Sequence, residues 1–457
     1  MDEAYTAVRR TRRQTVLDRL EASALVLPAA PQLQTGGDGE LRYTPDADLF
    51  YLTGYTEPEA VAVLCPGHEA PFTLFVRPRN PAAERWTGTR GGVEAAERLG
   101  ADAAYPVDEL GERLFAITRD ADRILLRVGT GREDVEDIVR RLLVRGRNRR
   151  RRWGRGPHVL ADAGVVLDDL RMIKDDDERE RMRDAALVTV EGFREALGLV
   201  APGRGEWEIE ATIDAAFRRR HADGPAFPTI AAAGANATVL HYIDNDAVLE
   251  AGDLLLLDAG ARVQGYCGDV TRTVPVDGRL RAEQREVYDA VLAAHHAAVD
   301  AVRPEASMND VHMAAVRVLA DAMVQLHLLD GPVDVLLEQY REEEAARRAG
   351  DDPEPGGEPG ISTFYPHRTG HWLGLEVHDV GTQVVDDAPR PLRPGMVLTV
   401  EPGLYVPADA DAPAALRGLG VRIEDDVLVT ADGHEVLTAG LPVEADELPG
   451  LLPGPAA

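Results

Sequence analysis

Four consecutive leucines at positions 254–257 end in the carboxylate of Asp258. Such a run predicts a strand buried on both faces. An isolated charge is very unfavourable in apolar surroundings unless it is paired or binds a metal. Asp269 follows on the expected returning strand of a hairpin over residues 253–276, and two carboxylates brought together repel each other. The hairpin therefore holds either a divalent cation, or one Asp that caps a turn and another that pairs with Arg272.

The chain repeats this pattern about 140 residues later. A G-x5-D-x-G pattern starts at Gly252, and a G-x5-E-x-G pattern starts at Gly395. A second strand that carries a carboxylate follows each pattern, and two helices are expected before each. We interpret this as a duplicated helix–helix–hairpin unit whose halves can bring their carboxylates to one point. The four carboxylates are those of Asp258, Asp269, Glu401 and Glu424.

Twelve consecutive residues, 367–378, contain three histidines: His367, His371 and His378. This segment is also rich in glycine. The spacing of the first two is that of a zincin helix, but Pro366 and Gly370 favour a loop or strand instead. One histidine with four carboxylates is an oxygen-rich ligand set, which suits Mn²⁺, Co²⁺ or Mg²⁺ better than a thiolate-selective metal. The four negative charges balance two divalent cations, which together can activate water and polarise a carbonyl.

Composition and charge exclude several classes of function. The net charge is −29 over 457 residues, which disfavours nucleic acid or an anionic membrane as a partner. We interpret the arginine-rich stretch 145–155 as a solvated loop. Two cysteines are too few for a disulfide framework and suit a reducing compartment. Neither a signal peptide nor an apolar run long enough to span a membrane is visible, so we expect a cytoplasmic protein.

Two domains with mixed α/β (α+β) character are expected. Residues 1–167 alternate helical and strand-like patterns, which predicts an N-terminal α/β domain. This includes a strand at 49–55. The repeat lies in a second domain over residues 168–445. Its long helices are predicted at 176–198, 206–222, 283–303 and 308–329.

Two low-hydrophobicity stretches interrupt or follow the second domain. Residues 331–360 are rich in Glu, Asp, Pro and Gly, which predicts a mobile surface insertion with at most a brief helix at 342–348. Residues 446–457 are rich in Pro and Gly and predict a disordered tail.

Several motifs resemble those of the pita-bread metallopeptidases. They are H-Y at 241–242, D-A-G at 258–260, G-D-V-T-R-T at 268–273, the segment 367–379, T-V-E-P-G at 399–403 and R-I-E-D-D at 422–426. The whole chain resembles the Xaa-Pro aminopeptidase (aminopeptidase P) family, including the N-terminal stretches around Asp48 and Trp86. The expected second domain is therefore a pita-bread domain with an internal pseudo-two-fold repeat.

The resemblance implies a dinuclear-metal aminopeptidase for peptides with proline in the second position. A hydroxide that bridges two Mn²⁺ ions would attack the carbonyl, with Co²⁺, Mg²⁺ or Zn²⁺ as alternative ions. Glu401 would help to accept the proton of the bridging water, and Asp269 and Glu424 would bridge both ions. The five implied ligands are Asp258, Asp269, His371, Glu401 and Glu424.

The resemblance also implies roles for residues around the metals. His241 and His378 would stabilise the tetrahedral intermediate or orient the substrate, and His367 and Arg422 would line the pocket. Asp48 and Trp86 would reach the active site of a neighbouring subunit in a homodimer or homotetramer. Arg368 stands where many relatives have glycine, and the 331–360 insertion is long. Both departures can alter access to the pocket.

Two other functions share this fold. A prolidase has the same ligands but cuts Xaa-Pro dipeptides. Pita-bread domains also serve as non-catalytic binding proteins, and those have lost metal ligands. All five ligand positions are intact in this chain, which favours catalysis.

Overall fold

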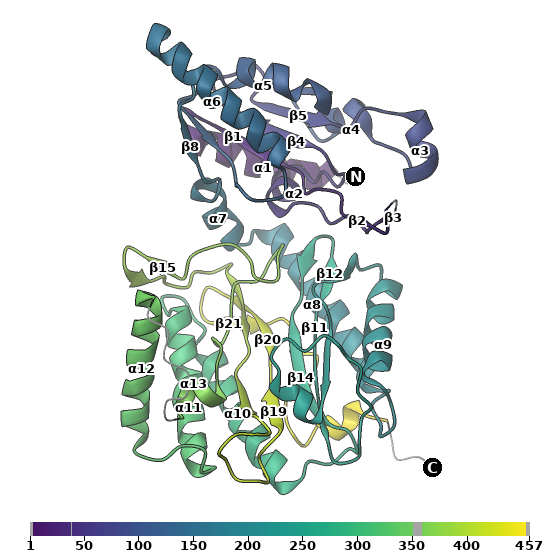
Figure 1. Ribbon diagram of the computed structural model, residues 1–457, viewed down its shortest axis with the longest axis vertical. Coiled ribbons are helices and arrows are strands. Elements are labelled where there is room, and N and C mark those ends of the chain that lie inside the picture. The colour runs from purple at the N-terminus through teal and green to yellow at the C-terminus, as the bar shows by residue number, and fades with distance from the viewer. Residues whose placement is uncertain (1–2, 38, 351–358, 454–457) are drawn as a thin grey trace. The chain divides into compact units, whose positions relative to one another are not determined.

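The computed structural model describes residues 3–37, 39–350 and 359–453 and divides into two compact units, Met1–Arg171 and Met172–Ala457 (Figure 1). The division falls within α7 (Gly164–Met172). Each unit has its own buried apolar cluster, as expected for a chain of this length.

A mixed sheet with the strand order β6-β5-β4-β1-β7-β8 forms the centre of the N-terminal unit. β1 pairs antiparallel with β4 and parallel with β7, and its six residues are all buried. The strands are β1 (Ser23–Pro28), β4 (Val61–Leu64), β5 (Phe72–Val76), β6 (Ala103–Pro106), β7 (Arg123–Leu125) and β8 (Val159–Ala161). The other elements are α1 (Glu3–Leu20), β2 (Gln34–Thr35), β3 (Gly39–Glu40), α2 (Ala47–Thr53), α3 (Pro81–Thr87), α4 (Gly92–Arg98), α5 (Leu110–Thr118) and α6 (Glu133–Trp153).

The prediction of a strand at 49–55 is wrong, because residues 49–53 belong to helix α2, which ends at Gly54. The Asp46 side chain accepts a hydrogen bond from the Leu49 amide at 2.8 Å and caps the first turn. Gly54, with φ of +70°, ends the helix in the left-handed conformation. Local capping therefore outweighs the strand-like pattern of apolar residues.

The prediction of a loop at 145–155 is also wrong for most of that stretch. Helix α6 continues to Trp153 and ends at Gly154, whose φ is +72°. Arg149 and Arg150 pair with aspartates of the same unit, at 2.9 Å from Asp120 and 2.7 Å from Asp122. These pairs and the good helix propensity of arginine account for the continued helix.

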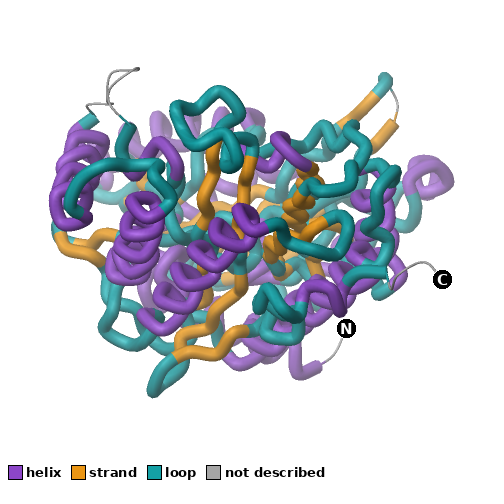
Figure 2. The backbone as a smooth tube through the Cα atoms, turned by 90° about the horizontal axis from the view of Figure 1, so that it is seen from below, coloured by secondary structure: helices purple, strands orange, loops and turns teal. Residues whose placement is uncertain are grey.

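Helices lie on both sides of the strands in the C-terminal unit (Figure 1), and Figure 2 marks the two types of element along the trace. The four predicted long helices are present as α8 (Asp176–Leu197), α9 (Glu206–Arg219), α10 (Ala282–Ala301) and α11 (Met308–Gln325). The strands are β9 (Gly224–Pro225), β10 (Ile230–Ala233), β11 (Leu254–Ala259), β12 (Ala261–Val263), β13 (Tyr266–Cys267), β14 (Val270–Pro275), β15 (Val384–Val385), β16 (Ala388–Pro389), β17 (Val397–Val400), β18 (Gly403–Val406), β19 (Leu419–Arg422), β20 (Asp425–Val429) and β21 (His434–Val436).

The predicted hairpin and its repeat are both formed. β11 pairs antiparallel with β14, and β17 pairs in the same way with β20. Gly252 and Gly395 have φ of +91° and +95°, so each supplies a left-handed turn just before its strand. An isolated bridge between Thr271 and Glu424 joins the two halves.

The prediction of a mobile insertion at 331–360 is wrong for the first part of that stretch. Residues Val333–Ala349 form helix α12, which buries Leu336, Leu337 and Tyr340 against the core. The apolar spacing of these residues outweighs the charged composition of the stretch. Residues 351–358 of the predicted insertion lie outside the described part, and α13 (Ile361–Phe364) follows.

The tail also differs from its prediction. Leu448–Leu451 form a 3-10 helix, and the side chain of Leu448 is fully buried. Only residues 454–457 of the predicted tail lie outside the described part.

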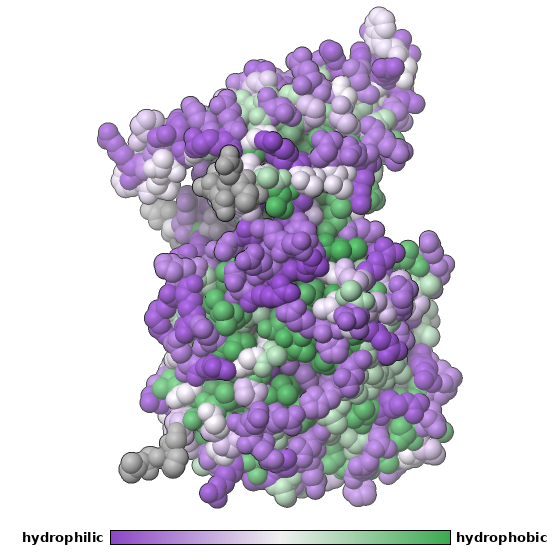
Figure 3. All heavy atoms as spheres, turned by 180° about the vertical axis from the view of Figure 1, so that it is seen from behind, coloured by the Kyte–Doolittle hydropathy of each residue, from purple (hydrophilic) through white to green (hydrophobic). Residues whose placement is uncertain are grey.

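Hydrophilic residues cover much of the face drawn in Figure 3, with apolar residues among them. Within the described residues, no helix has both the length and the apolar character that crossing a bilayer requires.

Candidate metal centre

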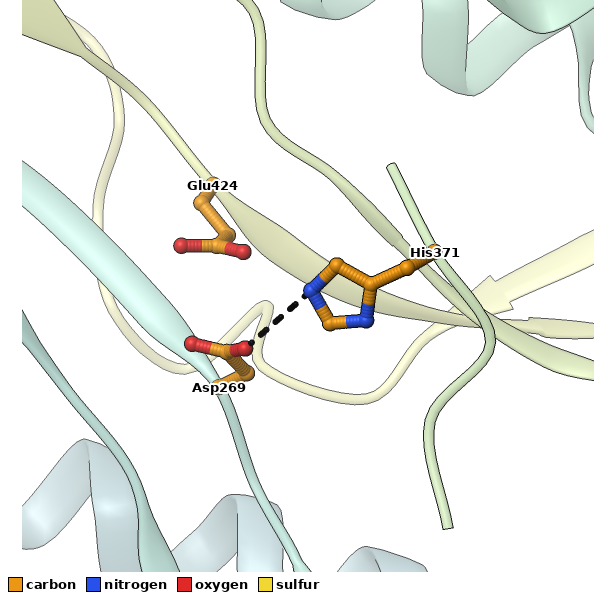
Figure 4. Close-up of side chains that lie close together, drawn as sticks. All are labelled: Asp269, His371 and Glu424. Carbon is orange, nitrogen blue, oxygen red and sulfur yellow. Dashed lines mark ion pairs between the residues drawn. The ribbon is translucent and has the colours of Figure 1, made fainter. Parts of the chain in front are cut away.

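Asp269, His371 and Glu424 come together from three separate segments (Figure 4). Asp269 precedes β14, Glu424 lies between β19 and β20, and His371 lies in the segment between α13 and β15. One ligand atom from each residue lies within 4.8 Å of the others, and Nε2 of His371 is 3.6 Å from Oδ2 of Asp269. The hairpin, its repeat and the histidine segment therefore supply one group of metal-binding side chains.

Glu401 and Asp258 extend this group. Glu401 follows β17 directly, and its Oε1 lies 3.6 Å from Nε2 of His371. Asp258 lies in β11 and lines the same cavity as the other four residues. The structure thus brings all five sequence-predicted ligand positions to one place.

The metal-free carboxylates repel one another strongly. Burial, together with the charges of Glu424 and Asp258, raises the pKa of Asp269 well above its usual value. Burial also raises the pKa of Glu424, and the negative charge of Glu401 raises it further. Burial and the nearby charge of Asp258 raise the pKa of Glu401 to about 8. Burial and the neighbouring His378 lower the pKa of His371 to about 4. Its imidazole is therefore neutral at pH 7, as a metal ligand must be.

The donor set fits divalent cations. Oδ1 of Asp258 is buried and has no hydrogen-bond partner among the described residues, although an orphaned buried oxygen is unfavourable. Nδ1 of His371 lies 3.1 Å from the carbonyl oxygen of Trp372, which assigns the proton to Nδ1 and leaves the lone pair of Nε2 for a metal. Both features are explained by cations among these side chains.

A hydrogen-bonded chain runs beside the carboxylates. Arg422 donates from Nη2 to Oδ2 of Asp258 at 2.5 Å and from Nη1 to the Tyr405 hydroxyl at 3.0 Å. The same hydroxyl is 2.8 Å from Nε2 of His367. This chain places His367 and Arg422 in the wall of the cavity. Sequence reasoning missed Tyr405, and only its position two residues after Gly403 of the repeat could have indicated it.

The cavity above the cluster has a volume of ≈ 940 Å³. His241 and His378 both line it, and the ring centroids of His371 and His378 are 4.1 Å apart. Burial and the nearby His241 lower the pKa of His378, which favours its neutral form. The space is large enough for several residues of an extended peptide, and it contains imidazoles on the metal side.

The alternative in which Arg272 pairs with one of the two hairpin aspartates, Asp258 or Asp269, is wrong. Arg272 is fully buried and donates from Nη2 to Asp425 at 2.7 Å and from Nη1 to the carbonyl oxygen of Glu424 at 2.6 Å. This arginine therefore stabilises the backbone that carries Glu424 and pairs with Asp425 rather than with Asp258 or Asp269.

The segment that carries the histidines is anchored at its far end by the buried Lys174, the lysine that the sequence contains once. Its Nζ lies 3.0 Å from Oδ2 of Asp379, and both side chains are 1% exposed. The backbone amide of Lys174 also donates to the carbonyl oxygen of Gly395. Sequence reasoning assigned no role to this lysine.

Asp48 and Trp86 lie in the N-terminal unit, away from the residues of the cluster along the chain. The carboxylate of Asp48 is buried and pairs with Arg127 at 2.6 Å and Arg171 at 2.7 Å. Trp86, on α3, is 90% exposed. Asp48 is thus held within its own unit, whereas the indole of Trp86 is presented to solvent.

Comparisons with known proteins agree with this geometry. Residues 180–431 match the model of metallopeptidase family M24, and residues 9–126 match the aminopeptidase P N-terminal domain. The Xaa-Pro aminopeptidase of Escherichia coli K12 is 36% identical over 96% of both chains. Xaa-Pro aminopeptidase 1 of Streptomyces coelicolor is 35% identical over 97% of this chain and 87% of its own.

Solved structures show the same fold. Aminopeptidase PepP of Pseudomonas aeruginosa aligns with a TM-score of 0.89 and 38% identity over 98% of this chain and 97% of that one. An Escherichia coli aminopeptidase P variant in complex with substrate aligns with a TM-score of 0.88 and 36% identity over 98% of both chains. The predicted combination of an N-terminal α/β domain and a pita-bread domain is confirmed. The chain belongs to metallopeptidase family M24 and, with its matching N-terminal domain, to the aminopeptidase P group within it.

Proposed function

We propose that this protein removes the N-terminal residue from peptides whose second residue is proline. The observation that supports this most directly is the convergence of the five ligand positions with His241, His367 and His378 on one cavity. The ligands would be Asp258, Asp269, His371, Glu401 and Glu424, with Asp269 and Glu424 shared between two Mn²⁺ ions. Their oxygen-rich character suits this ion.

Divalent cations held by these side chains would supply an activated water and would polarise the scissile carbonyl. The residues of the chain do the remaining work. Glu401 accepts the proton of the attacking water, because its carboxylate lies beside the cluster, with Oε1 3.6 Å from Nε2 of His371. His241 and His378 donate hydrogen bonds to the oxygen that becomes negative, and Arg422 keeps Asp258 in place through its 2.5 Å hydrogen bond.

Proline in the second position removes an interaction on which many peptidases depend. Its amide nitrogen carries no hydrogen, so a site that must bind the scissile N–H loses that contact. A cluster that activates water and fixes the free amino end does not need it. A prolidase uses the same chemistry on dipeptides, so substrate length distinguishes the two functions.

The test is to load the protein with Mn²⁺ and to assay Xaa-Pro-Xaa tripeptides beside Xaa-Pro dipeptides. We expect release of the N-terminal residue from tripeptides. Cleavage of dipeptides alone would assign a prolidase, and no cleavage together with no bound metal would assign a non-catalytic binding protein.

We further propose a homodimer or homotetramer in the cytoplasm. The exposed indole of Trp86 supports the assembly, because large aromatic side chains are enriched in interfaces. Cys65 and Cys267 are both buried free thiols, which suits a reducing compartment. Light scattering coupled to gel filtration tests the assembly, and a monomer for both the wild type and Trp86→Ala would contradict it.

A further inference from the structure

Arg368 differs from the other arginines of the cavity in its hydrogen bonds. Arg262, Arg368 and Arg422 all line the cavity. Arg422 uses Nε, Nη1 and Nη2 on Thr271, Tyr405 and Asp258, and Arg262 donates from both Nη atoms to the carbonyl oxygens of Leu375 and Ala226. Arg368 donates only from Nη1, to Oε2 of Glu344 at 2.7 Å. Its Nε and Nη2 donate to none of the described residues.

This leaves one edge of the guanidinium for a ligand. The Nε and Nη2 atoms of arginine are coplanar and form a fork that matches the two oxygens of a carboxylate. The Arg368 side chain is 33% exposed, so it remains partly accessible to a ligand. A carboxylate that enters the cavity can bind there with two charge-assisted hydrogen bonds.

Helix α12 holds Arg368 in position. Glu344, on α12, contacts Arg347 at 3.2 Å as well as Arg368 at 2.7 Å. The two arginines and one glutamate carry a net charge of +1, so the pairing does not neutralise Arg368. The charge that remains favours an anionic partner.

A second connection to α12 holds the neighbouring residue. The Thr369 hydroxyl lies 2.8 Å from Nδ1 of His312, and Nε2 of the same histidine lies 2.7 Å from the Tyr340 hydroxyl on α12. Thr369, His312 and Tyr340 are each at most 3% exposed. Because Arg368 and Thr369 are both attached to α12, the backbone that carries the guanidinium is fixed before a substrate binds, which reduces the entropy lost on binding.

The rest of the cavity gives the Arg368 guanidinium a distinct role. Carboxylates crowd the metal side, where cations and the free amino end of a peptide are attracted. A carboxylate of the same peptide is repelled from that side and attracted to an arginine. We propose that Arg368 is a specificity-determining residue that binds a carboxylate of the peptide substrate. The proposal rests on the proposed aminopeptidase function and adds a preference for substrates with an acidic group near the cleaved bond.

The acidic group can be the C-terminal carboxylate of a short peptide or an acidic side chain. Two pairs of substrates separate these sources: Ala-Pro-Ala as the free acid against its amide, and Ala-Pro-Asp-amide against Ala-Pro-Asn-amide. With the Mn²⁺-loaded wild type, we expect KM to be about tenfold lower for the anionic member of at least one pair, the size of one hydrogen bond to a charged group. The pair that shows the difference identifies the source.

The variant Arg368→Gln removes the charge and the fork. We expect KM for the anionic peptide to rise towards that of its neutral partner. Arg368→Lys keeps the charge but not the planar fork. Its ratio of KM for the neutral peptide to KM for the anionic peptide should lie between those of the wild type and Arg368→Gln. Arg341→Gln is the matched control, because Arg341 lies on α12 and pairs with Glu338 at 3.0 Å but does not line the cavity. It should keep the wild-type ratio.

Two results would overturn the inference while the proposed function stands. One is a wild type that cleaves all four peptides without preferring the anionic member of either pair. The other is a preference that persists in Arg368→Gln, provided that its circular dichroism and melting temperature match the wild type. A wild type that cleaves none of the peptides would instead overturn the proposed function and this inference with it.

Discussion

The hydroxyl of Thr271 donates a hydrogen bond to Oε2 of Glu424 at 2.7 Å, and these two residues come from the two halves of the C-terminal unit. The same hydroxyl accepts a hydrogen bond from Nε of Arg422 at 3.0 Å. Thr271 also forms an isolated bridge with Glu424 through the backbone. One buried threonine therefore fixes the orientation of a proposed metal ligand across the junction of the repeat.

Replacement of Thr271 by valine should weaken metal binding with little change in shape. The substitution removes both hydrogen bonds of the hydroxyl and leaves the Glu424 carboxylate less restrained. Loss of a group that orients a ligand typically lowers metal affinity about 10- to 100-fold. Titration of the metal-free protein with Mn²⁺ by calorimetry measures the change. Thr212→Val is the control, because its hydroxyl donates to the Glu208 carbonyl on α9 and, among the described residues, to no proposed ligand. Equal affinities in both variants would contradict the assigned role.

Asp269→Asn should abolish activity and reduce bound metal, with a loss of at least about 100-fold in kcat/KM, because Asp269 is a direct ligand in our proposal. The same change should raise the melting temperature of the metal-free protein, since it removes an ionisable group whose pKa is raised on folding by burial and by neighbouring carboxylates. Elemental analysis and differential scanning calorimetry measure the two effects. Asp277→Asn, at an exposed position after β14, should change neither. Full activity of Asp269→Asn would refute the ligand assignment.

Metal removal should make stability depend on pH. The pKa of Glu401, about 8 in the metal-free fold, lies above its ordinary value of 4.5. The folded state therefore keeps a proton that the unfolded chain has lost, and this contribution to stability disappears as the pH rises through 8. His371 acts in the opposite sense, but its pKa of about 4 against 6.5 confines its effect to lower pH.

Between pH 6.5 and 8, we therefore expect the melting temperature of the EDTA-treated protein to fall. Asp269 and Glu424 act in the same direction, because their pKa values are also raised. The Mn²⁺-loaded protein should change less, since bound cations favour the ionised carboxylates at every pH in this window. Parallel melting curves for the two forms would contradict the electrostatic account of the cluster.

Arg272→Met should destabilise the fold by about 3–5 kcal/mol, because it removes one partner of a buried ion pair and leaves Asp425 without its guanidinium. The additional change Asp425→Asn should recover part of the loss. Arg285→Met is the control: Arg285 forms ion pairs with Asp289 and Asp446 at the surface, and such pairs typically contribute at most about 1 kcal/mol. Guanidinium denaturation followed by circular dichroism gives the free energies of unfolding. A loss of less than about 1 kcal/mol in Arg272→Met would show that the pair has no large role.

The sequence alone was sufficient for the elements around the site. A run of leucines between a glycine turn and an aspartate predicts a buried strand without knowledge of its neighbours, and β11 is formed as expected. The repeated glycine spacing predicts the second hairpin for the same local reason. The predictions from sequence were wrong where capping residues or packing partners outside the pattern determine the structure of a segment. Residues 49–53 belong to a helix because of the Asp46 cap and the Gly54 terminator, and α12 forms because three of its apolar residues pack against the core.

Only the tertiary structure decided which side chains meet. The sequence could name Arg272 as a partner for a carboxylate, but the choice of Asp425 over the two hairpin aspartates depends on how β14 and β20 lie against each other. The link from Tyr405 to His367, and the links from α12 to Arg368 and through His312 to Thr369, consist of hydrogen bonds between residues 24 to 57 positions apart. These separations follow no periodic pattern. The types of ligand and their chemistry are properties of the residues themselves. Their distances, burial and remaining hydrogen-bonding capacity arise only when long-range packing brings the segments together.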